Sequence, residues 1–277
     1  MIYLVGGRGR VGQAITASRP ASEVTLLERD RYQDWWRPGS AKDVAQFFKG
    51  APAGSVVVVA AGLLDPALPH QLLRRVNVDL PLQVLEGATD AGLRVITLGT
   101  VMEQLTSHPN VYVASKSELG LQVARRAGAG DPVLHLQIHT LYGGGPPAPF
   151  MFLGQMCHAI HRGIPFEMSP GRQLREYHHV DDDVSALHAL IAAGVVGIAP
   201  VSHGEPSTLA DLASAVFKAV GRMDLLRIGA RPEPPDDNYA TVLARPAVLA
   251  GISFRPAQAG VAEYVKSQLS RSERLPK

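Results

Sequence analysis

The sequence of 277 residues predicts an α/β fold, a doubly wound parallel sheet with a smaller C-terminal region, for three reasons. A β-favouring stretch at residues 2–5 runs into four closely spaced glycines and then into an apolar segment with helical spacing at 11–16. Apolar runs of strand length then alternate with helical patterns, which is the order of a parallel sheet covered by helices. One run, SVVVVAA at 55–61, is apolar throughout, as a parallel strand buried on both faces requires.

The first half of the chain provides the sheet. The sequence predicts strands at 2–5, 23–28, 55–61, 94–99 and 133–139, and helices at 11–16, 41–49, 70–92 and 112–127. The stretch 70–92 contains two helical segments that meet near Asn77 and Pro81. Ligands of such sheets bind beyond the carboxyl ends of the strands, so we expect Gly62 and Thr100, which follow two strands, to border the cleft.

The second half begins at a loop rich in glycine and proline, residues 142–149, which is the clearest change of composition in the chain. We place a domain boundary there, so that residues 1–145 form the first domain, with a return of the chain around 175–202, and residues 146–277 form the smaller region. Its predicted elements are helices at 151–162, 181–194, 207–220 (capped by Ser207) and 256–269, strand-like stretches at 171–180 and 198–202, and a frayed tail at 270–277.

Composition excludes several classes of function. The net charge of +2, without long basic runs, argues against a nucleic-acid-binding surface. No apolar run reaches membrane-spanning length, and a first strand at residue 1 or 2 leaves no room for a signal peptide. The single cysteine, Cys157, cannot form an internal disulfide. We therefore expect a cytoplasmic protein with neither a nucleic-acid nor a membrane partner.

The glycine-rich start, VGGRGRVG at 5–12, is typical of a dinucleotide-binding (Rossmann) turn. Gly6 allows a sharp turn off the strand, and Gly9 lets the backbone approach a pyrophosphate. Gly12 lets the helix pack on the sheet with its N-terminus toward the phosphates. The spacing GxxGxxG by itself also fits a purely structural turn, but its position directly after an N-terminal strand favours nucleotide binding.

An acid at the end of the second strand bears on the choice of cofactor. Glu28 stands about 20 residues after the glycines, where an acid accepts hydrogen bonds from the adenosine ribose and repels a 2′-phosphate. Arg8 and Arg29 lie close by in the sequence and could instead hold that phosphate or be solvated surface charges. We favour NAD over NADP and leave both open.

A tyrosine and a lysine one helical turn apart carry the predicted chemistry. Tyr112 and Lys116, in YVASK, are neighbours on one helix face. An ammonium one turn away favours the phenolate and lowers the pKa of the phenol, which suits Tyr112 to general acid–base work. Thr100 follows the preceding strand, where its hydroxyl could hydrogen-bond the substrate oxygen whose charge changes in hydride transfer.

The chain resembles the extended short-chain dehydrogenase/reductases, in particular their nucleotide-sugar epimerase, dehydratase and 4-ketoreductase branch. VGGRGRVG is similar to the family's TGGxGxxG, VVVVAAG to its strand ending in LAA, and YVASK to its YxxSK. RVNVDLPLQVLEGATDAG is similar to NVxGTxNVLEAAxxAG, and LREYHHVDDDVSAL to RDFIHVDDVA. RGRVG, LGT and REYHHVDD together resemble 4-ketosugar reductases of the GDP-fucose synthase type.

The resemblance implies a nicotinamide cofactor and a nucleotide-activated sugar as substrate. It implies that Tyr112 is the general acid/base, that Lys116 holds the nicotinamide ribose and lowers the tyrosine pKa, and that Thr100 positions the sugar oxygen. Arg175 is expected to meet the nucleotide diphosphate, and Tyr142 is a second expected substrate contact. The expected cofactor-binding residues are Gly6, Arg8, Gly9, Arg10, Val11, Glu28, Ala60, Ala61, Gly62, Asn77, Tyr112 and Lys116.

The sequence departs from the family pattern at two places. The serine- and threonine-rich SSxxVYG stretch is TLGTVMEQL here, so either Thr97 or Thr100 could supply the hydroxyl, and about a dozen residues separate Thr100 from Tyr112, roughly half the family spacing. LRxxNxYGP appears as LQIHTLYGG, which loses the Arg and Asn and places His139 nearby. The surroundings of the nicotinamide or sugar are expected to differ accordingly.

We therefore predict an NAD(P)-dependent oxidoreductase acting on a nucleotide-activated sugar, foremost a 4-keto-sugar reductase. An epimerase that uses tightly held NAD through a 4-keto intermediate is the alternative, and a non-catalytic NAD(P)-binding regulator a further one. The sequence specifies neither the nucleobase, nor the sugar, nor the stereochemistry.

Two further expectations concern assembly and metals. Leu80, Val84, Leu119 and Val123 are apolar at helical spacing, which fits a helix bundle shared by a homodimer and equally a stripe that faces the sheet. His178 and His179 have no acid or cysteine at ligand spacing, and the acids at 181–183 match a helix N-terminus. No metal site is predicted.

Overall fold

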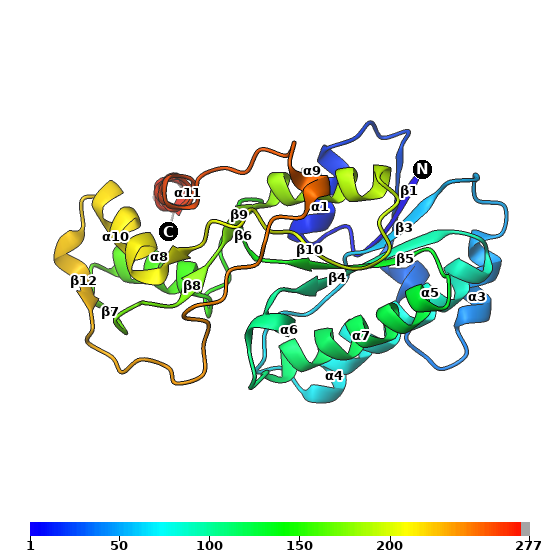
Figure 1. Ribbon diagram of the computed structural model, residues 1–277. Helices are drawn as coiled ribbons and strands as arrows, with labels where there is room; N and C mark the ends of the chain where they lie inside the picture. The colour runs from blue at the N-terminus through cyan, green and yellow to red at the C-terminus, as the bar shows by residue number, and fades with distance from the viewer. Residues whose placement is uncertain (273–277) are drawn as a thin grey trace.

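Six of the strand-length runs form one parallel sheet in the computed structural model, which describes residues 1–272 (Figure 1). The strand order is β10–β5–β4–β3–β1–β2. This confirms the predicted fold class. The strands are β1 Ile2–Val5, β2 Val24–Leu27, β3 Val56–Val59, β4 Arg94–Thr100, β5 Val133–Ile138 and β10 Gly197–Pro200.

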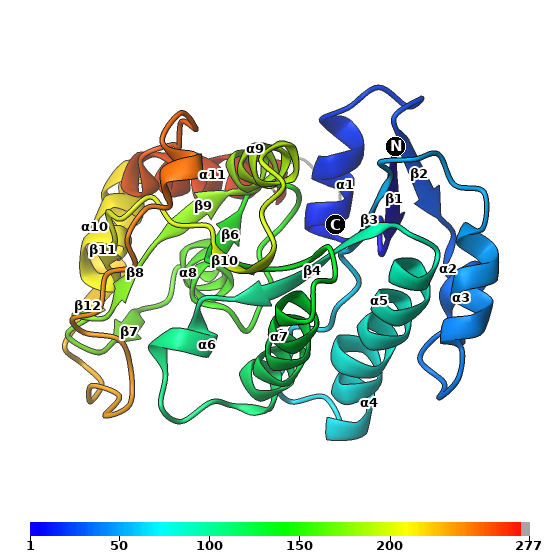
Figure 2. The same ribbon diagram turned by 45° about the vertical axis from the view of Figure 1, so that its right-hand side comes forward.

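Helices cover both faces of the sheet (Figures 1 and 2). The helices α1 Arg10–Ala17 and α9 Val180–Ala192 pack on one face, and α3 Ala41–Phe48, α5 Leu80–Asp90 and α7 Val111–Gly128 on the other. Alternation along β3 shows why that strand is apolar throughout. Val56 and Val58 pack toward α1 and α9, while Val57 and Val59 pack toward the opposite helices.

The strand order reverses between β1 and β3, which places a crevice beyond their carboxyl ends. Between β2 and β3 the chain forms the short helix α2 Arg29–Tyr32 and then α3. The turn after β1 packs against the end of β3, because the amides of Ala60 and Ala61 both donate to the carbonyl of Val5, at 2.8 and 3.0 Å.

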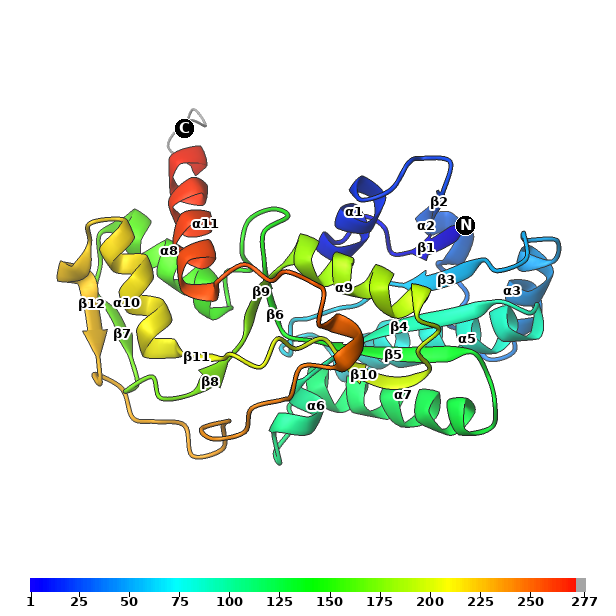
Figure 3. The same cartoon turned by 45° about the horizontal axis from the view of Figure 1, so that its top comes forward.

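The C-terminal region has a hydrophobic core of its own, and its helices lie together at one end of the molecule (Figure 3). The helices α8 Phe152–Arg162, α10 Leu209–Ala219 and α11 Ala257–Ser272 bury Met156, Val216, Phe217 and Val261. Three two-stranded pairs accompany these helices: β6 Thr140–Tyr142 with β9 Tyr177–His179, β7 Phe166–Met168 with β12 Leu226–Ile228, and β8 Leu174–Arg175 with β11 Ser207–Thr208.

The chain crosses between the two cores more than once. The run β9–α9–β10 returns to the large sheet, which is the return expected around 175–202. A second return, the 3-10 turn η3 Ala247–Leu249, buries Leu249 against α9. The carboxyl ends of the strands therefore face the C-terminal region, and several connecting segments join the two. The boundary at residue 145 stays a prediction.

Local differences from the sequence analysis occur at element ends. Thr208, not Ser207, caps α10, because its hydroxyl accepts from the amide of Asp211 at 3.0 Å. The last helix extends through Ser272, so the tail expected to fray is helical at 270–272, and residues 273–277 lie outside the described residues. Short elements without a clear period, among them α2, β6, β7, β12 and α6 Met102–Leu105, were not predicted.

The stripe of apolar residues behind the dimer prediction faces the sheet. Leu80, Val84, Leu119 and Val123 are at most 6% exposed and belong to the core under α5 and α7. The sheet-facing interpretation of these residues is therefore right, and their pattern does not support a dimer interface. Among the described residues, no helix has the length and apolar character needed to cross a membrane.

Candidate active site

A cavity of about 620 Å³ opens beyond the carboxyl ends of the strands, between the large sheet and the C-terminal region. It extends from the start of α1 to the loop after β12. The predicted site residues that line it are Gly9, Arg10, Val11, Ala60, Ala61, Gly62, Thr100, Tyr112, Lys116 and Arg175. These residues come from five separate segments of the chain, which meet beyond the carboxyl ends of the strands.

The glycine turn has the backbone that the motif predicts. Gly6 has φ +89°, and a Cβ there would lie 2.2 Å from the amide nitrogen of Ala61. Gly12 packs against the turn itself, since its Cβ would lie 2.5 Å from the Cα of Gly7. A Cβ at Gly9 would come no closer than 3.6 Å to the Gly6 carbonyl, so Gly9 lies against open space at the cavity edge, before the N-terminus of α1.

Two arginines of this turn have different surroundings. Arg8 forms an ion pair with Glu28 at 2.8 Å, and both side chains are largely exposed. Arg10 donates to the carbonyls of Gly143 and Pro146, which ties the start of α1 to the loop that leads into the C-terminal region. Arg10 lines the cavity, and Arg8 and Glu28 lie outside its lining.

Helix α7 presents Tyr112 and Lys116 to the cavity. Asn110 fixes the start of this helix, because its side chain accepts from the amide of Val113 at 2.9 Å. Lys116 is 6% exposed, and its Nζ donates to the Leu98 carbonyl at 2.9 Å. Burial lowers the pKa of Lys116 to about 8, against an opposing effect of the Glu103 carboxylate.

The pKa of Tyr112 moves in the direction opposite to our expectation. Burial raises it well above its ordinary value of 10, and the negative charge of Glu103 raises it further. We expected Lys116 to lower the pKa of Tyr112, but neither the burial of this side chain nor the nearby acid is evident from the spacing of residues along the chain. Both effects favour the protonated phenol of Tyr112.

The structure separates the two candidate threonines. Thr100 ends β4 and lines the cavity, where its Oγ1 accepts from the amide of Met102 at 3.3 Å. Thr97 is fully buried, and its hydroxyl is 2.8 Å from Nδ1 of His135. Only Thr100 can meet a ligand in the cavity.

Glu103 is a buried acid that sequence reasoning missed. It lies one helical turn past Thr100, with its side chain 5% exposed, and accepts from the amide of Thr100 at 2.7 Å and from Gln137 at 3.0 Å. His135 Nε2 is 3.1 Å from Glu103 Oε1. Despite the opposing effect of burial, these partners lower the pKa of Glu103. The sequence carries only a weak sign of the Glu103–His135 pair, namely two glycines that leave room for it. A Cβ at Gly99 or Gly120 would lie within 2.8 Å of a Glu103 carboxylate oxygen.

Asn77, a predicted cofactor contact, lies outside the cavity lining. Asn77 is fully buried in the π-helical turn η1 Arg75–Asp79, where its amide bonds both backbone groups of Leu63 and the hydroxyl of Ser115. Asn77 therefore joins the end of β3 to α7. It does not line the cavity.

The placement of Tyr142 as a substrate contact is wrong. Its side chain is 1% exposed and fills the space above Gly260, next to the rings of His179 and Tyr264. The glycine-rich loop carries Tyr142 into the core of the C-terminal region. Arg175 does line the cavity, and its guanidinium is paired with Asp237.

The lining residues fit a dinucleotide at the sheet end of the cavity. Gly9 offers backbone at the start of α1, a helix N-terminus with its positive dipole end toward the opening. Gly62 leaves the end of β3 open beside Lys116, since a Cβ there would already lie 3.4 Å from Nζ. The profile described as "NAD dependent epimerase/dehydratase family" matches residues 2–200. The chain belongs to this family.

The epimerase/dehydratase fold extends over the whole chain. A UDP-N-acetylglucosamine 4-epimerase from Methanobrevibacter ruminantium M1 matches with a TM-score of 0.77 at 18% identity, covering 98% of each chain. A dTDP-glucose 4,6-dehydratase from Streptomyces venezuelae, with NAD bound, matches with 0.75 at 20% identity, covering 99% of this chain and 97% of that one.

A GDP-L-fucose synthetase from Naegleria fowleri matches with a TM-score of 0.74 at 14% identity, covering 100% of this chain and 95% of that one. At these identities the likeness shows the fold alone. No curated protein sequence matches the chain. Family membership relates the protein to NAD-dependent epimerases and dehydratases and leaves the exact reaction to the chemistry of the site.

Proposed function

We propose that this family member reduces a nucleotide-activated 4-keto sugar with NAD(P)H, with Tyr112 as the proton donor. The observation that carries the proposal is the meeting of Tyr112, Lys116 and Thr100 in one cavity that begins at the glycine turn. The matched dehydratase, epimerase and fucose synthetase are all named for nucleotide sugars, which supports the substrate class.

The protein residues have separate tasks. When bound, the nicotinamide ring exchanges a hydride with a sugar carbon. Thr100 and Tyr112 hydrogen-bond the oxygen on that carbon, and Tyr112 donates its proton as the carbonyl becomes an alcohol. Lys116 holds the ribose hydroxyls next to the ring and, as an ammonium, stabilises the phenolate left on Tyr112.

The protonation state of Tyr112 favours the reductive direction. A reductase needs a proton donor at the start of its reaction, and the raised pKa of Tyr112 keeps the phenol protonated. An epimerase first removes a proton from a sugar hydroxyl, so it needs the phenolate.

The epimerase reading remains our alternative, with NAD held through a transient 4-keto sugar. An epimerase retains NAD through purification and dialysis, whereas a reductase releases its oxidised cofactor after each turnover. A non-catalytic NAD(P)-binding regulator is the further alternative, and the intact Tyr112–Lys116 pair counts against it.

The test is turnover with a panel of nucleotide 4-keto sugars that vary in base and sugar, followed by the loss of NADH or NADPH absorbance. Oxidation of the cofactor with at least one member supports the proposal. NAD that copurifies and survives dialysis, together with interconversion of two nucleotide sugars, supports the epimerase. Cofactor binding without turnover of any member of the panel would support the non-catalytic regulator.

We also propose that the enzyme works in the cytoplasm as a homodimer through the outer faces of α5 and α7. Leu121, on the outer face of α7, is 60% exposed and supports a contact there. A monomer by light scattering at micromolar concentration would contradict the dimer.

A further inference from the structure

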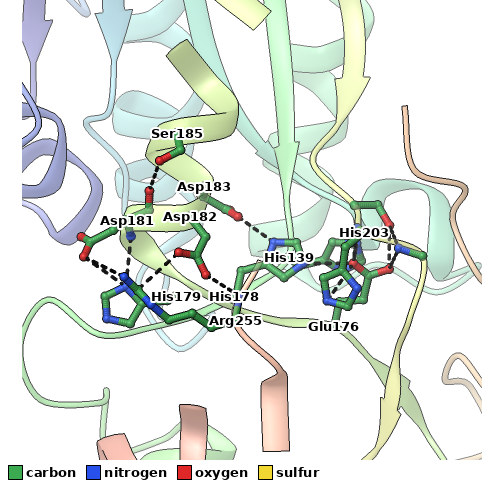
Figure 4. Close-up of polar contacts among 12 residues, drawn as sticks. His139, Glu176, His178, His179, Asp181, Asp182, Asp183, Ser185, His203 and Arg255 are labelled. Atoms are coloured by element: carbon green, nitrogen blue, oxygen red, sulfur yellow. Dashed lines mark hydrogen bonds and ion pairs between the residues drawn. The ribbon is translucent and has the colours of Figure 1, made fainter. Parts of the chain in front are cut away.

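Three histidines surround one buried carboxylate at the C-terminal side of the cavity (Figure 4). Glu176, between β8 and β9, has its side chain 2% exposed. Its Oε2 is 3.0 Å from Nε2 of His178 and 3.6 Å from Nε2 of both His139 and His203. His139 comes from the junction of β5 and β6, so these residues are distant in sequence and converge only in the fold.

The hydrogen bonds around His178 show that a positive charge belongs between it and Glu176. Nδ1 of His178 is 2.6 Å from a carboxylate oxygen of Asp183; when Asp183 is ionised, Nδ1 carries a proton and donates it. In a neutral ring, Nε2 then has a lone pair facing the Glu176 oxygen. Two lone pairs at 3.0 Å repel, unless a proton or a metal ion lies between them.

His139 provides a second, independent observation. Its side chain is 6% exposed, and within residues 1–272 its buried Nε2 has no hydrogen-bond partner. The 3.6 Å from Glu176 Oε2 is too long for a hydrogen bond. A buried ring nitrogen left unpaired beside a carboxylate is costly unless a ligand binds it.

We propose that Nε2 of His139, Nε2 of His178 and Oε2 of Glu176 bind a Zn²⁺ ion in the wall of the cavity. The three atoms lie within 4.8 Å of one another. Atoms bound at about 2.0–2.2 Å to a tetrahedral ion are about 3.3–3.6 Å apart. Of the two N···O distances, 3.6 Å lies at the upper end of that range and 3.0 Å lies a little below it.

Charge and the surrounding contacts agree with a divalent ion. Glu176 and Asp183 are two buried carboxylates, which a single Zn²⁺ neutralises when both histidines are neutral. The contact from Asp183 to the distal nitrogen of His178 is the usual support of a metal-bound histidine. The other oxygen of Glu176 is held by the hydroxyl of Ser202 at 2.6 Å and the amide of Gly204 at 3.1 Å.

His203 is not assigned as a ligand, because its tautomer excludes it. Its Nδ1 accepts from the amide of Glu205 at 3.1 Å, so Nε2 carries the proton and has no lone pair for a metal. Three protein ligands leave the fourth position open, as in catalytic zinc sites. His139 and Glu176 also line the cavity, so that position can take water or a ligand oxygen from the cavity.

The test uses the full chain with any affinity tag removed, stripped of metal with a chelator and checked for fold by circular dichroism. Zn²⁺ binding is measured by calorimetry and elemental analysis, and Co²⁺ binding by its visible absorption. We expect one equivalent of either metal per chain, and a rise in melting temperature on adding Zn²⁺.

Variants locate the site. His139→Ala breaks no hydrogen bond of Nε2 and should weaken Zn²⁺ binding at least 10-fold, while Asp183→Asn should weaken it about 10–100-fold. His161→Ala removes an exposed imidazole on α8 and should bind as wild type does.

Failure of the stripped wild type to bind one equivalent of Zn²⁺ or Co²⁺ would overturn the proposal, as would wild-type affinity in His139→Ala. If His139→Ala does not fold, the Co²⁺ spectrum of the wild type and the affinity of Asp183→Asn decide the question by the same criteria.

Discussion

The guanidinium of Arg8, in the glycine turn, lies 2.8 Å from the carboxylate of Glu28, which follows β2. The acid expected to select NAD and the nearest cation expected to hold the 2′-phosphate of NADP therefore neutralise each other. Both side chains are exposed, so the ion pair contributes little to stability. It bears instead on the choice between NAD and NADP.

Glu28→Ala should shift cofactor preference toward NADP. The substitution removes the acceptor for the ribose hydroxyls and releases Arg8, so the affinity for NAD falls and that for NADP rises. Titration of both cofactors by intrinsic fluorescence measures the change, with Glu23→Ala, the partner of Arg19, as the control. A wild type that already prefers NADP strongly would show that our reading of Glu28 is wrong.

Tyr112→Phe should lower kcat by about 10²–10⁴-fold while substrate and cofactor still bind, because it removes only the proton-exchanging hydroxyl. Tyr142→Phe is the matched control: its buried hydroxyl has no hydrogen-bond partner in the described chain, so kcat should not change. Steady-state kinetics of both variants with the identified substrate tests this prediction. Activity of Tyr112→Phe within a few-fold of wild type would remove this residue from the mechanism.

Lys116→Met should make the free protein more stable and a poorer enzyme. The folded pKa of about 8 lies below the unfolded value of 10.5, so the unfolded chain binds more protons between these values. Burying the ammonium therefore costs about 3 kcal/mol below pH 8, a cost that fades as pH rises from 8 to 10.5. Loss of the bond to Leu98 offsets about 1 kcal/mol of the gain.

Urea unfolding at pH 7 measures the stability of Lys116→Met, and cofactor titration its affinity. In the wild type, cofactor affinity should fall as pH rises through about 8, because the ammonium is lost. A variant that is less stable than wild type at pH 7 would show that the buried charge is not a cost.

The two threonines should respond in different ways. Thr100→Val removes one donor to the reacting oxygen and should lower kcat by about 10²-fold with little loss of stability. Thr97→Val leaves Nδ1 of the buried His135 without its partner and should lower the free energy of unfolding by about 1–3 kcal/mol. Kinetics and urea unfolding of both variants test this. Equal effects on kcat would argue against the assignment of Thr100.

Glu103→Gln should shift the pH profile toward lower pH. The carboxylate raises the pKa of both Tyr112 and Lys116, so its replacement by a neutral amide lowers both. Glu103 acts through its neighbours, so it is a positioning residue. Glu118→Gln, at an exposed acid paired with Arg74, should leave the profile unchanged. Unchanged profiles in both variants would contradict the role of Glu103.

The sequence by itself determined the fold class, because strand and helix periods are local properties of the chain. The apolar run 55–61 and the glycine turn at Gly6 required a buried parallel strand and a positive φ, and both are present. The pairing of Tyr112 with Lys116 was equally local, since one helical turn separates them.

Only the tertiary structure decided what surrounds these residues. Contacts between segments that are distant in sequence place Glu103 at the site and bring His139, Glu176 and His178 together. Such contacts also give Thr97 and Thr100 different surroundings. The burial of Tyr142 and of the α5–α7 stripe depends on which face meets a core. The pKa values of Tyr112 and Lys116 follow from desolvation and from a carboxylate brought near by folding, and no spacing along the chain encodes either.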